Sequence, residues 1–172
     1  MIELPADGSI ENSDAVTAEQ NKTISIVLPV YNEEKVLNEL HEGLANVADS
    51  RSEKFEFIFV NDGSNDDSLG KLLELRSRDG RVCIVDLARN FGQHSSLTAG
   101  LTEACGDVAI LMDADLEDLP QDIPKFLEKW YEGYQVVYAI RKNRNTSLLR
   151  LCLFNLFHKL SSKISSIDLD AE

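Results

Sequence analysis

The stretch FEFIFVNDGS at residues 55–64 decides the fold, because an apolar run ends abruptly in polar and acidic residues. Residues 55–60 are typical of a buried strand, and residues 108–112 repeat this pattern just before the acidic stretch DADLE at 113–117. Carboxylates that follow parallel strands lie along one edge of an open α/β sheet, the edge where such sheets bind ligands. The two stretches therefore predict a parallel sheet with an acidic ligand site at one edge.

Strand and helix patterns alternate along the rest of the chain. Further strands are predicted at residues 24–28, 82–87 and 135–140, and helices at about 33–48, 66–77, 93–105, 120–131 and 147–164. Strands rich in β-branched residues that alternate with helices indicate an α/β fold whose mainly parallel sheet is flanked by helices. Pro29 is expected to stop the first strand, because proline cannot donate to a sheet ladder.

Length and charge limit the possible functions. The chain has 172 residues, with 17 Lys and Arg against 30 Asp and Glu, a net charge of −13. This length suits one domain, and so acidic a chain is repelled by phosphate backbones, which excludes non-specific nucleic-acid binding. Residues 1–22 are acidic and poor in apolar side chains. We therefore expect a mobile tail over 1–22 and one folded domain over 23–172.

The last third of the chain is basic. No acidic residue lies between Glu132 and Asp168, whereas six Lys and Arg side chains do. The helix predicted at 147–164 carries an apolar stripe flanked by these basic residues, and stripes of this kind more often pack into a core. A basic amphipathic helix also binds anionic membrane surfaces. We expect this helix to lie at a membrane surface.

Cysteine usage and hydropathy indicate the compartment. Cys83, Cys105 and Cys152 show no disulfide spacing, so we expect buried, reduced cysteines in a cytosolic protein. The amino terminus lacks the pattern of a secretory signal, and no apolar run reaches the roughly 18 residues of a spanning helix. We therefore expect a cytoplasmic chain that attaches to a membrane only peripherally.

Asp113, Asp115 and Glu117 form the sharpest chemical pattern. Asp-x-Asp alone is common in surface turns, but here three acids at every second position directly follow a strand. Converging carboxylates repel one another unless a cation lies between them, and hard divalent cations prefer oxygen ligands. The spacing therefore predicts a Mg²⁺ or Mn²⁺ site, at which the ion would neutralise a diphosphate.

Two other strand ends carry candidate binding residues. Asp62 ends the strand at 55–60, where its carboxylate could accept hydrogen bonds from a base or a ribose. Tyr31 could stack on a base, although Asn32, Glu33 and Glu34 beside it are equally explained as the start of a helix. The chain has no Gly-x-Gly-x-x-Gly and no Walker sequence, which argues against a dehydrogenase or a P-loop ATPase.

Four motifs in order resemble family 2 glycosyltransferases: LPVYNEE (28–34), VNDGSND (60–66), ARNFGQ (88–93) and MDADLED (112–118). They are most similar to the branch that glycosylates polyprenyl phosphates, such as dolichyl-phosphate mannosyltransferase and bactoprenol glucosyltransferases. The resemblance covers about residues 23–170. It implies a GT-A fold and inverting transfer of a sugar from a UDP- or GDP-sugar, with Mg²⁺ or Mn²⁺, to a lipid phosphate such as dolichyl or undecaprenyl phosphate.

The resemblance also implies roles for individual residues. The nucleotide-sugar pocket would comprise Pro29, Tyr31, Glu33, Val60, Asp62, Ala114 and Arg141. The metal ligands would be Asp113, Asp115 and Glu117, the last in a position where the family often has glutamine. Asp115 is the candidate catalytic residue, with Asp170 as an alternative.

The resemblance leaves two alternative functions open. Family members continue past a segment like 168–172 into further interfacial and often transmembrane helices, so we expect the domain to be incomplete at its carboxyl terminus. The chain could then be a non-catalytic nucleotide-sugar-binding remnant of such an enzyme. A sugar nucleotidyltransferase is less favoured, because it would need a basic, glycine-rich phosphate loop where residues 31–34 are acidic.

Overall fold

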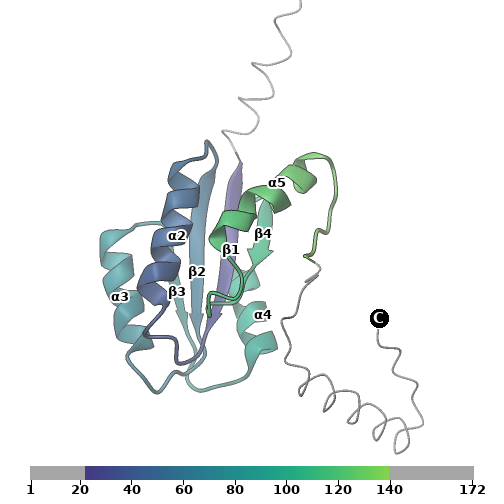
Figure 1. The fold of residues 1–172 in the computed structure, drawn as a ribbon. Helices are drawn as coiled ribbons and strands as arrows, with labels where there is room; N and C mark the ends of the chain where they lie inside the picture. The colour runs from purple at the N-terminus through teal and green to yellow at the C-terminus, as the bar shows by residue number, and fades with distance from the viewer. Residues whose placement is uncertain (1–21, 140–172) are drawn as a thin grey trace, which may run out of the picture. The chain divides into compact units, whose positions relative to one another are not determined.

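A single parallel sheet forms the centre of the protein, in the computed structural model that describes residues 22–139. Its strand order is β3-β2-β1-β4 (Figure 1). The strands are β1 (Thr23–Val30), β2 (Lys54–Asn61), β3 (Val82–Asp86) and β4 (Val108–Leu111). All three pairings are parallel, which confirms the predicted sheet.

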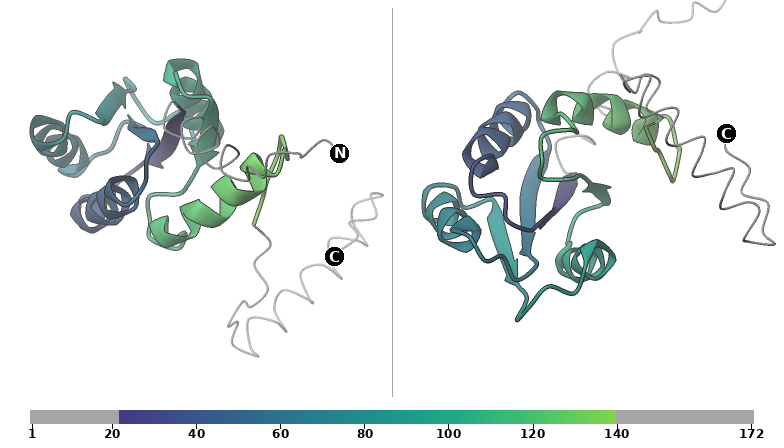
Figure 2. Two further views of the ribbon diagram at one scale, coloured as in Figure 1. Left: turned by 90° about the horizontal axis from the view of Figure 1, so that it is seen from above. Right: turned by 60° about the horizontal axis from the view of Figure 1, so that its bottom comes forward.

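Helices cover both faces of the sheet. They are α2 (Leu37–Asp49), α3 (Ser68–Arg78), α4 (Gln93–Glu103), a short 3-10 helix η1 (Pro120–Asp122) and α5 (Ile123–Tyr131). Apolar residues of α2, α3 and α5 pack on one face of the sheet. Helix α4 packs on the other face, against Val27, Ile58 and Val60. The view from above shows α4 and α2 on opposite sides of the strands (Figure 2).

Strand β1 continues through Pro29, so the prediction that proline stops it is wrong. Pro29 is in register with Val60 of β2, whereas the ladder between β1 and β4 ends at Val27 opposite Leu111. Beyond Val27, therefore, β1 is paired with β2 alone, as at the edge of a sheet. Proline is tolerated at sheet edges because its missing N–H is not needed on the open side.

The strand order creates a reversal between β1 and β4. The chain runs outward from β1 through β2 to β3 and then crosses to the other side of β1 to form β4. The connection that makes this crossing, α4, packs on the other face of the sheet from α2 and α3. Open α/β sheets bind ligands in the crevice at such a reversal, beside the carboxyl ends of the strands.

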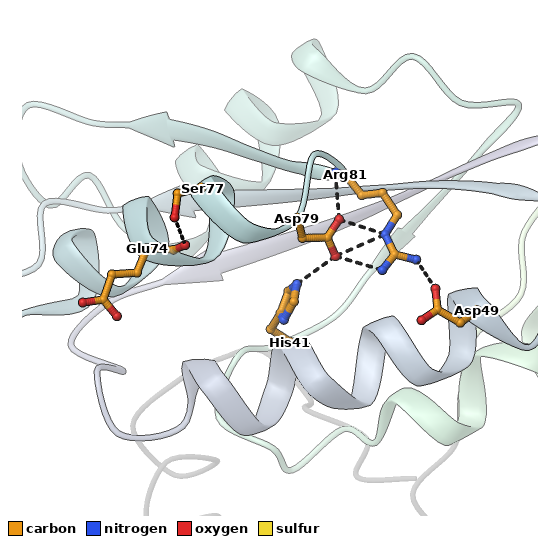
Figure 3. A network of polar contacts seen from close by, with 6 residues as sticks. All are labelled: His41, Asp49, Glu74, Ser77, Asp79 and Arg81. Carbon is orange, nitrogen blue, oxygen red and sulfur yellow. Dashed lines mark hydrogen bonds and ion pairs between the residues drawn. The ribbon is translucent and has the colours of Figure 1, made fainter.

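A charged network lies at the amino ends of the strands, at the edge of the sheet opposite the carboxyl ends (Figure 3). Arg81, just before β3, donates to both carboxylate oxygens of Asp79, at 2.9 Å each from Nε and Nη2. Its Nη1 donates to Asp49 at the end of α2 over 2.6 Å, and His41 Nε2 lies 3.0 Å from Asp79 Oδ2. The network thus ties α2 to the turn between α3 and β3. Hydrogen bonds from the Arg81 side chain lower the pKa of Asp79 to about 2.

The strand predicted at 135–140 is not formed over residues 135–139. Val136 and Tyr138 have apolar side chains at alternate positions, but they are 81% and 76% exposed. An alternating pattern makes a strand only when a neighbouring strand accepts its hydrogen bonds, and the ladders of the described sheet do not include these residues. The division between two compact units of the chain falls after Gln135, and every helix and strand described above belongs to the first.

Several other predictions concern the ends of the chain. The structure does not describe the acidic tail up to residue 21, Arg141, Cys152 or the basic helix predicted at 147–164.

The predicted burial of Cys105 is wrong. Cys105 is exposed, because it lies in the loop that follows α4. Within residues 22–139, no helix is both long enough and apolar enough to cross a membrane.

Candidate nucleotide-sugar site

An open crevice of about 310 Å³ lies at the reversal between β1 and β4. It is lined by Pro29, Val30, Tyr31, Glu33, Asp62, Asn90, Gly92, Gln93, Asp113, Ala114 and Asp115. These residues come from the end of β1, the start of α4 and the loops after all four strands, which are far apart in sequence. The crevice therefore lies where the sheet topology predicts a ligand site.

The crevice brings together seven of the predicted site residues: Pro29, Tyr31, Glu33, Asp62, Asp113, Ala114 and Asp115. Val60 and Glu117 are not in its lining. Val60 is fully buried in the core beneath α4 and is in register with Pro29, which does line the crevice. Glu117 is bonded through its backbone N–H to Asp115 Oδ1 at 2.9 Å.

The loop after β1 is joined to the loop after β2. Asn32 has a left-handed backbone (φ 60°), and its side-chain oxygen accepts the N–H of Asn65 at 2.7 Å. The N–H groups of Glu33 and Glu34 donate to Ser68 Oγ and Asp66 Oδ2. Residues 34–36 form a turn, in which the Val36 N–H donates to the Glu33 carbonyl, and α2 begins at Leu37 and not at the predicted residue 33. Glu33 is thereby held in the crevice wall instead of a helix.

Asp62 binds the protein backbone. Its Oδ1 accepts the N–H of Phe91 at 2.8 Å, and its Oδ2 accepts the N–H of Gly92 at 2.9 Å. The residue is only 3% exposed. The carboxylate therefore fastens the turn before α4 to the end of β2. Each oxygen has a second lone pair, so a contact with a bound nucleotide remains compatible with these bonds.

Asp113 and Asp115 follow β4 and lie on the crevice wall. Asp113 Oδ1 accepts a hydrogen bond of 2.7 Å from the side-chain amide of Gln93, the first residue of α4. Leu116 takes a left-handed conformation (φ 63°), which turns the chain back so that the Glu117 N–H reaches Asp115. The loop thus places two carboxylates in the lining on either side of Ala114.

The pKa of Glu33 reflects its burial and its acidic neighbours. Burial raises this pKa above its ordinary value of 4.5, and the negative charges of Asp115 and Asp66 raise it further. A carboxylic acid is harder to ionise where neighbouring carboxylates are close, and a bound cation relieves that repulsion. The crevice is therefore suited to a ligand that brings positive charge.

The donor set fits a divalent ion shared with a ligand. Among residues 22–139, no group of three or more His, Cys, Asp or Glu side chains is arranged to hold a metal by itself. Mg²⁺ is commonly held by one or two carboxylates together with substrate phosphates, not by a cage made only of protein. Asp113 and Asp115 supply two such carboxylates in the crevice lining. The three-carboxylate site with Glu117 stays a prediction.

Besides Val30, three lining residues were not singled out from the sequence: Asn90, Gly92 and Gln93. They belong to the motif ARNFGQ, and the place of this motif in the family resemblance was the only indication in the sequence that they belong to the site. Their place in the crevice depends on Asp62, about 30 residues earlier, which holds the turn against β2. A contact at this separation between a side chain and the backbone has no sequence pattern of its own.

Comparison with known proteins assigns the chain to a family. Residues 25–153 match the model of glycosyl transferase family 2, so the protein belongs to that family. Glucosyl-3-phosphoglycerate synthase from Mycobacterium tuberculosis, solved in complex with UDP, superposes with a TM-score of 0.59 at 22% identity. The match covers 94% of this chain and 56% of that one, and it shows the fold alone. The predicted GT-A fold is confirmed.

Two curated relatives are similar in sequence. The chain is 44% identical over 146 residues to the uncharacterized glycosyltransferase YkcC of Bacillus subtilis (strain 168), a match covering 84% of this chain and 45% of that protein. It is 39% identical over 140 residues to undecaprenyl-phosphate 4-deoxy-4-formamido-L-arabinose transferase of Klebsiella pneumoniae (strain 342), covering 81% and 43% respectively. The chain thus spans less than half the length of either relative.

Proposed function

We propose that this chain carries the donor site of an inverting glycosyltransferase that moves a sugar from a UDP- or GDP-sugar to a polyprenyl phosphate. The observation that carries the proposal is the crevice at the reversal between β1 and β4, where Asp113 and Asp115 meet Tyr31 and Glu33. A lipid-phosphate acceptor is supported by the relative named as an undecaprenyl-phosphate sugar transferase.

Different crevice residues would contact different parts of the nucleotide-sugar donor. Tyr31 is exposed at the mouth, with its hydroxyl 3.5 Å from the Asn65 amide, and its ring offers a face on which a base can stack. Glu33 and Asp62 offer acceptors to the ribose or base, while Pro29, Val60 and Ala114 shape the floor. Arg141 would meet the donor phosphates or the acceptor.

Asp113 and Asp115 would hold Mg²⁺ or Mn²⁺ together with the donor diphosphate, and Glu117 would be a further ligand. The bound ion would supply stabilisation of the negative charge that develops on the departing nucleoside diphosphate. The acceptor phosphate is ionised near pH 7, so its oxygen attacks the anomeric carbon from the face opposite the leaving group. Little general-base assistance is needed, and Asp115 is the candidate residue for it, with Asp170 as the alternative.

The membrane association proposed for the protein rests on its substrate and on its sequence. A polyprenyl phosphate resides in a membrane, and the basic segment 141–163 carries six positive charges that attract anionic lipid. We therefore propose a cytoplasmic protein that works at the membrane surface. Binding to vesicles with and without anionic lipid measures this directly.

Calorimetric titration of the 172-residue chain tests the donor site. UDP-glucose and GDP-mannose are titrated with Mn²⁺ and with EDTA. We expect one nucleotide to bind at least tenfold more tightly when Mn²⁺ is present. Asp115→Asn should remove this metal dependence, whereas Glu42→Gln, which removes a negative charge from an exposed site on α2, should retain it. Equal binding of both donors with and without metal would contradict the proposal.

Transfer of labelled sugar to undecaprenyl phosphate separates an enzyme from a binding domain. Measurable product that depends on Asp115 supports catalysis by this chain. Metal-dependent donor binding without any transfer would leave the alternative, a non-catalytic nucleotide-sugar-binding domain.

A further inference from the structure

Gln93 lies at the junction of two crevice walls. It is the first residue of α4, and its side-chain Nε2 donates a hydrogen bond of 2.7 Å to Asp113 Oδ1. Both residues line the crevice. We propose that Gln93 is a positioning residue for Asp113: it fixes the orientation of this carboxylate for a divalent ion. The inference rests on the proposed function.

The physical reason is the freedom of an aspartate side chain. The terminal torsion of aspartate is broad, so a carboxylate on a loop rotates easily unless one of its oxygens is held. A hydrogen bond of 2.7 Å to Oδ1 limits that rotation. Groups that orient metal-binding carboxylates in this way commonly change metal affinity by 10-fold to 100-fold when they are removed.

The turn that presents Gln93 is itself held in place. The backbone N–H groups of Phe91 and Gly92 both donate to Asp62, which is nearly buried at the end of β2. Gly63 packs directly beneath the same turn: a Cβ at this position would lie 2.6 Å from the backbone nitrogen of Asn90. The turn is therefore attached to β2 by two hydrogen bonds and by a close backbone contact.

Asp62 consequently acts on Asp113 through the turn and Gln93. The connection runs from the end of β2, through the first turn of α4, to the end of β4, around one side of the crevice. A neutral amide suits this role, because it holds the carboxylate without cancelling the charge that attracts the ion. A lysine at position 93 would form a similar hydrogen bond but would compete with the cation.

Electron paramagnetic resonance of Mn²⁺ tests the role of Gln93. The 172-residue chain is titrated with Mn²⁺ at saturating UDP, and the signal of free Mn²⁺ gives the affinity. Gln93→Met keeps the length and helix propensity of the side chain but removes the donor. We expect it to bind Mn²⁺ 10-fold to 100-fold more weakly. His94→Met, at the exposed neighbouring position, should stay within about twofold, since it has no part in this contact.

Two negative outcomes are distinguishable. Unchanged Mn²⁺ affinity in Gln93→Met, with tight binding by the native chain, would overturn the role of Gln93 and leave the donor site standing. Failure of the native chain to bind Mn²⁺ with either UDP or GDP would overturn the donor site itself, and with it this inference.

A double-mutant cycle tests the link to Asp62. We expect Asp62→Asn to weaken Mn²⁺ binding more in the native background than in the Gln93→Met background, where only its own contact with the nucleotide is lost, because residues that act through one another are not additive. Equal losses in both backgrounds would overturn the link. Urea unfolding of each variant shows whether the fold is kept. If Asp62→Asn unfolds, the Mn²⁺ titration of Gln93→Met still tests the role of Gln93, because Gln93 is exposed and its substitution leaves the core intact.

Discussion

The crevice and the network around Arg81 lie at opposite edges of the same sheet, and both gather acidic side chains. In the network, Asp79 and Asp49 receive hydrogen bonds from a guanidinium, and His41 lies beside Asp79. In the crevice, the carboxylate of Asp62 is held by two backbone amides and that of Asp113 by a glutamine amide. In these contacts the donor is a cation at one edge and a neutral group at the other.

The pKa shifts follow from this difference. Arg81 lowers the pKa of Asp79 to about 2, so this carboxylate is ionised and stabilising at neutral pH. Burial and the charges of Asp115 and Asp66 raise the pKa of Glu33. The backbone amides and the Gln93 amide hold Asp62 and Asp113 without adding positive charge themselves. The acids of the network stabilise the fold, whereas those of the crevice suit a ligand that carries a cation.

The largest expected effect is on the crevice side, from Gly63→Ala. Gly63 has a φ of 63°, and an added Cβ would meet the backbone of Arg89 and Asn90. Strain at this φ and the forced backbone shift together should lower the free energy of unfolding by about 3 kcal/mol. Urea unfolding measures the change. Gly80→Ala, where the added Cβ has open space, is the control and should change the value by less than about 1 kcal/mol. Similar values for the two variants would mean that the two loops are not in close contact.

The second largest expected effect is a loss of stability at low pH, and it comes from Asp79 in the network. The folded-state pKa of Asp79 is depressed from 3.8 to about 2, so its contribution is present above pH 3.8 and is lost as the pH falls toward 2. Between pH 6 and pH 2, the native chain should therefore lose about 2 kcal/mol more unfolding free energy than Asp79→Asn. Urea unfolding at several pH values measures the difference. Parallel curves for the two proteins would show that Asp79 carries no such linkage.

The smallest effect has the opposite sign and is on the crevice side. Glu33 has a raised pKa in the folded state, so ionising it costs stability once the pH exceeds 4.5. Glu33→Gln should raise the free energy of unfolding slightly at pH 7 and should have no such effect in acid. Donor binding should weaken in the same variant. A loss of stability at pH 7 would indicate that Glu33 supports the fold.

The sheet and the position of the site were predictable because their signals are local. Apolar runs such as residues 55–60 mark buried strands, and acids directly after them must lie at the carboxyl edge of a parallel sheet. For this reason the sequence alone predicts Asp62, Asp113 and Asp115 at one edge, and all three line the crevice. The strand predicted at 135–140 carried an equally local pattern, but over 135–139 the ladder that a strand requires is missing.

The contacts that shape the crevice could not be predicted, because they join distant parts of the chain. The hydrogen bonds that Phe91 and Gly92 donate to Asp62, and that Gln93 donates to Asp113, depend on how the loops pack. The same is true of Pro29, whose place inside β1 depends on where the ladder to β4 ends.

Anomalous diffraction from crystals grown with Mn²⁺ and UDP tests the central claim most directly. We predict a single strong manganese peak in the crevice, within coordination distance of Asp113, Asp115 and the UDP diphosphate. A peak at the Asp79–Asp49 network instead, or UDP bound in the crevice without any manganese beside these two aspartates, would contradict it.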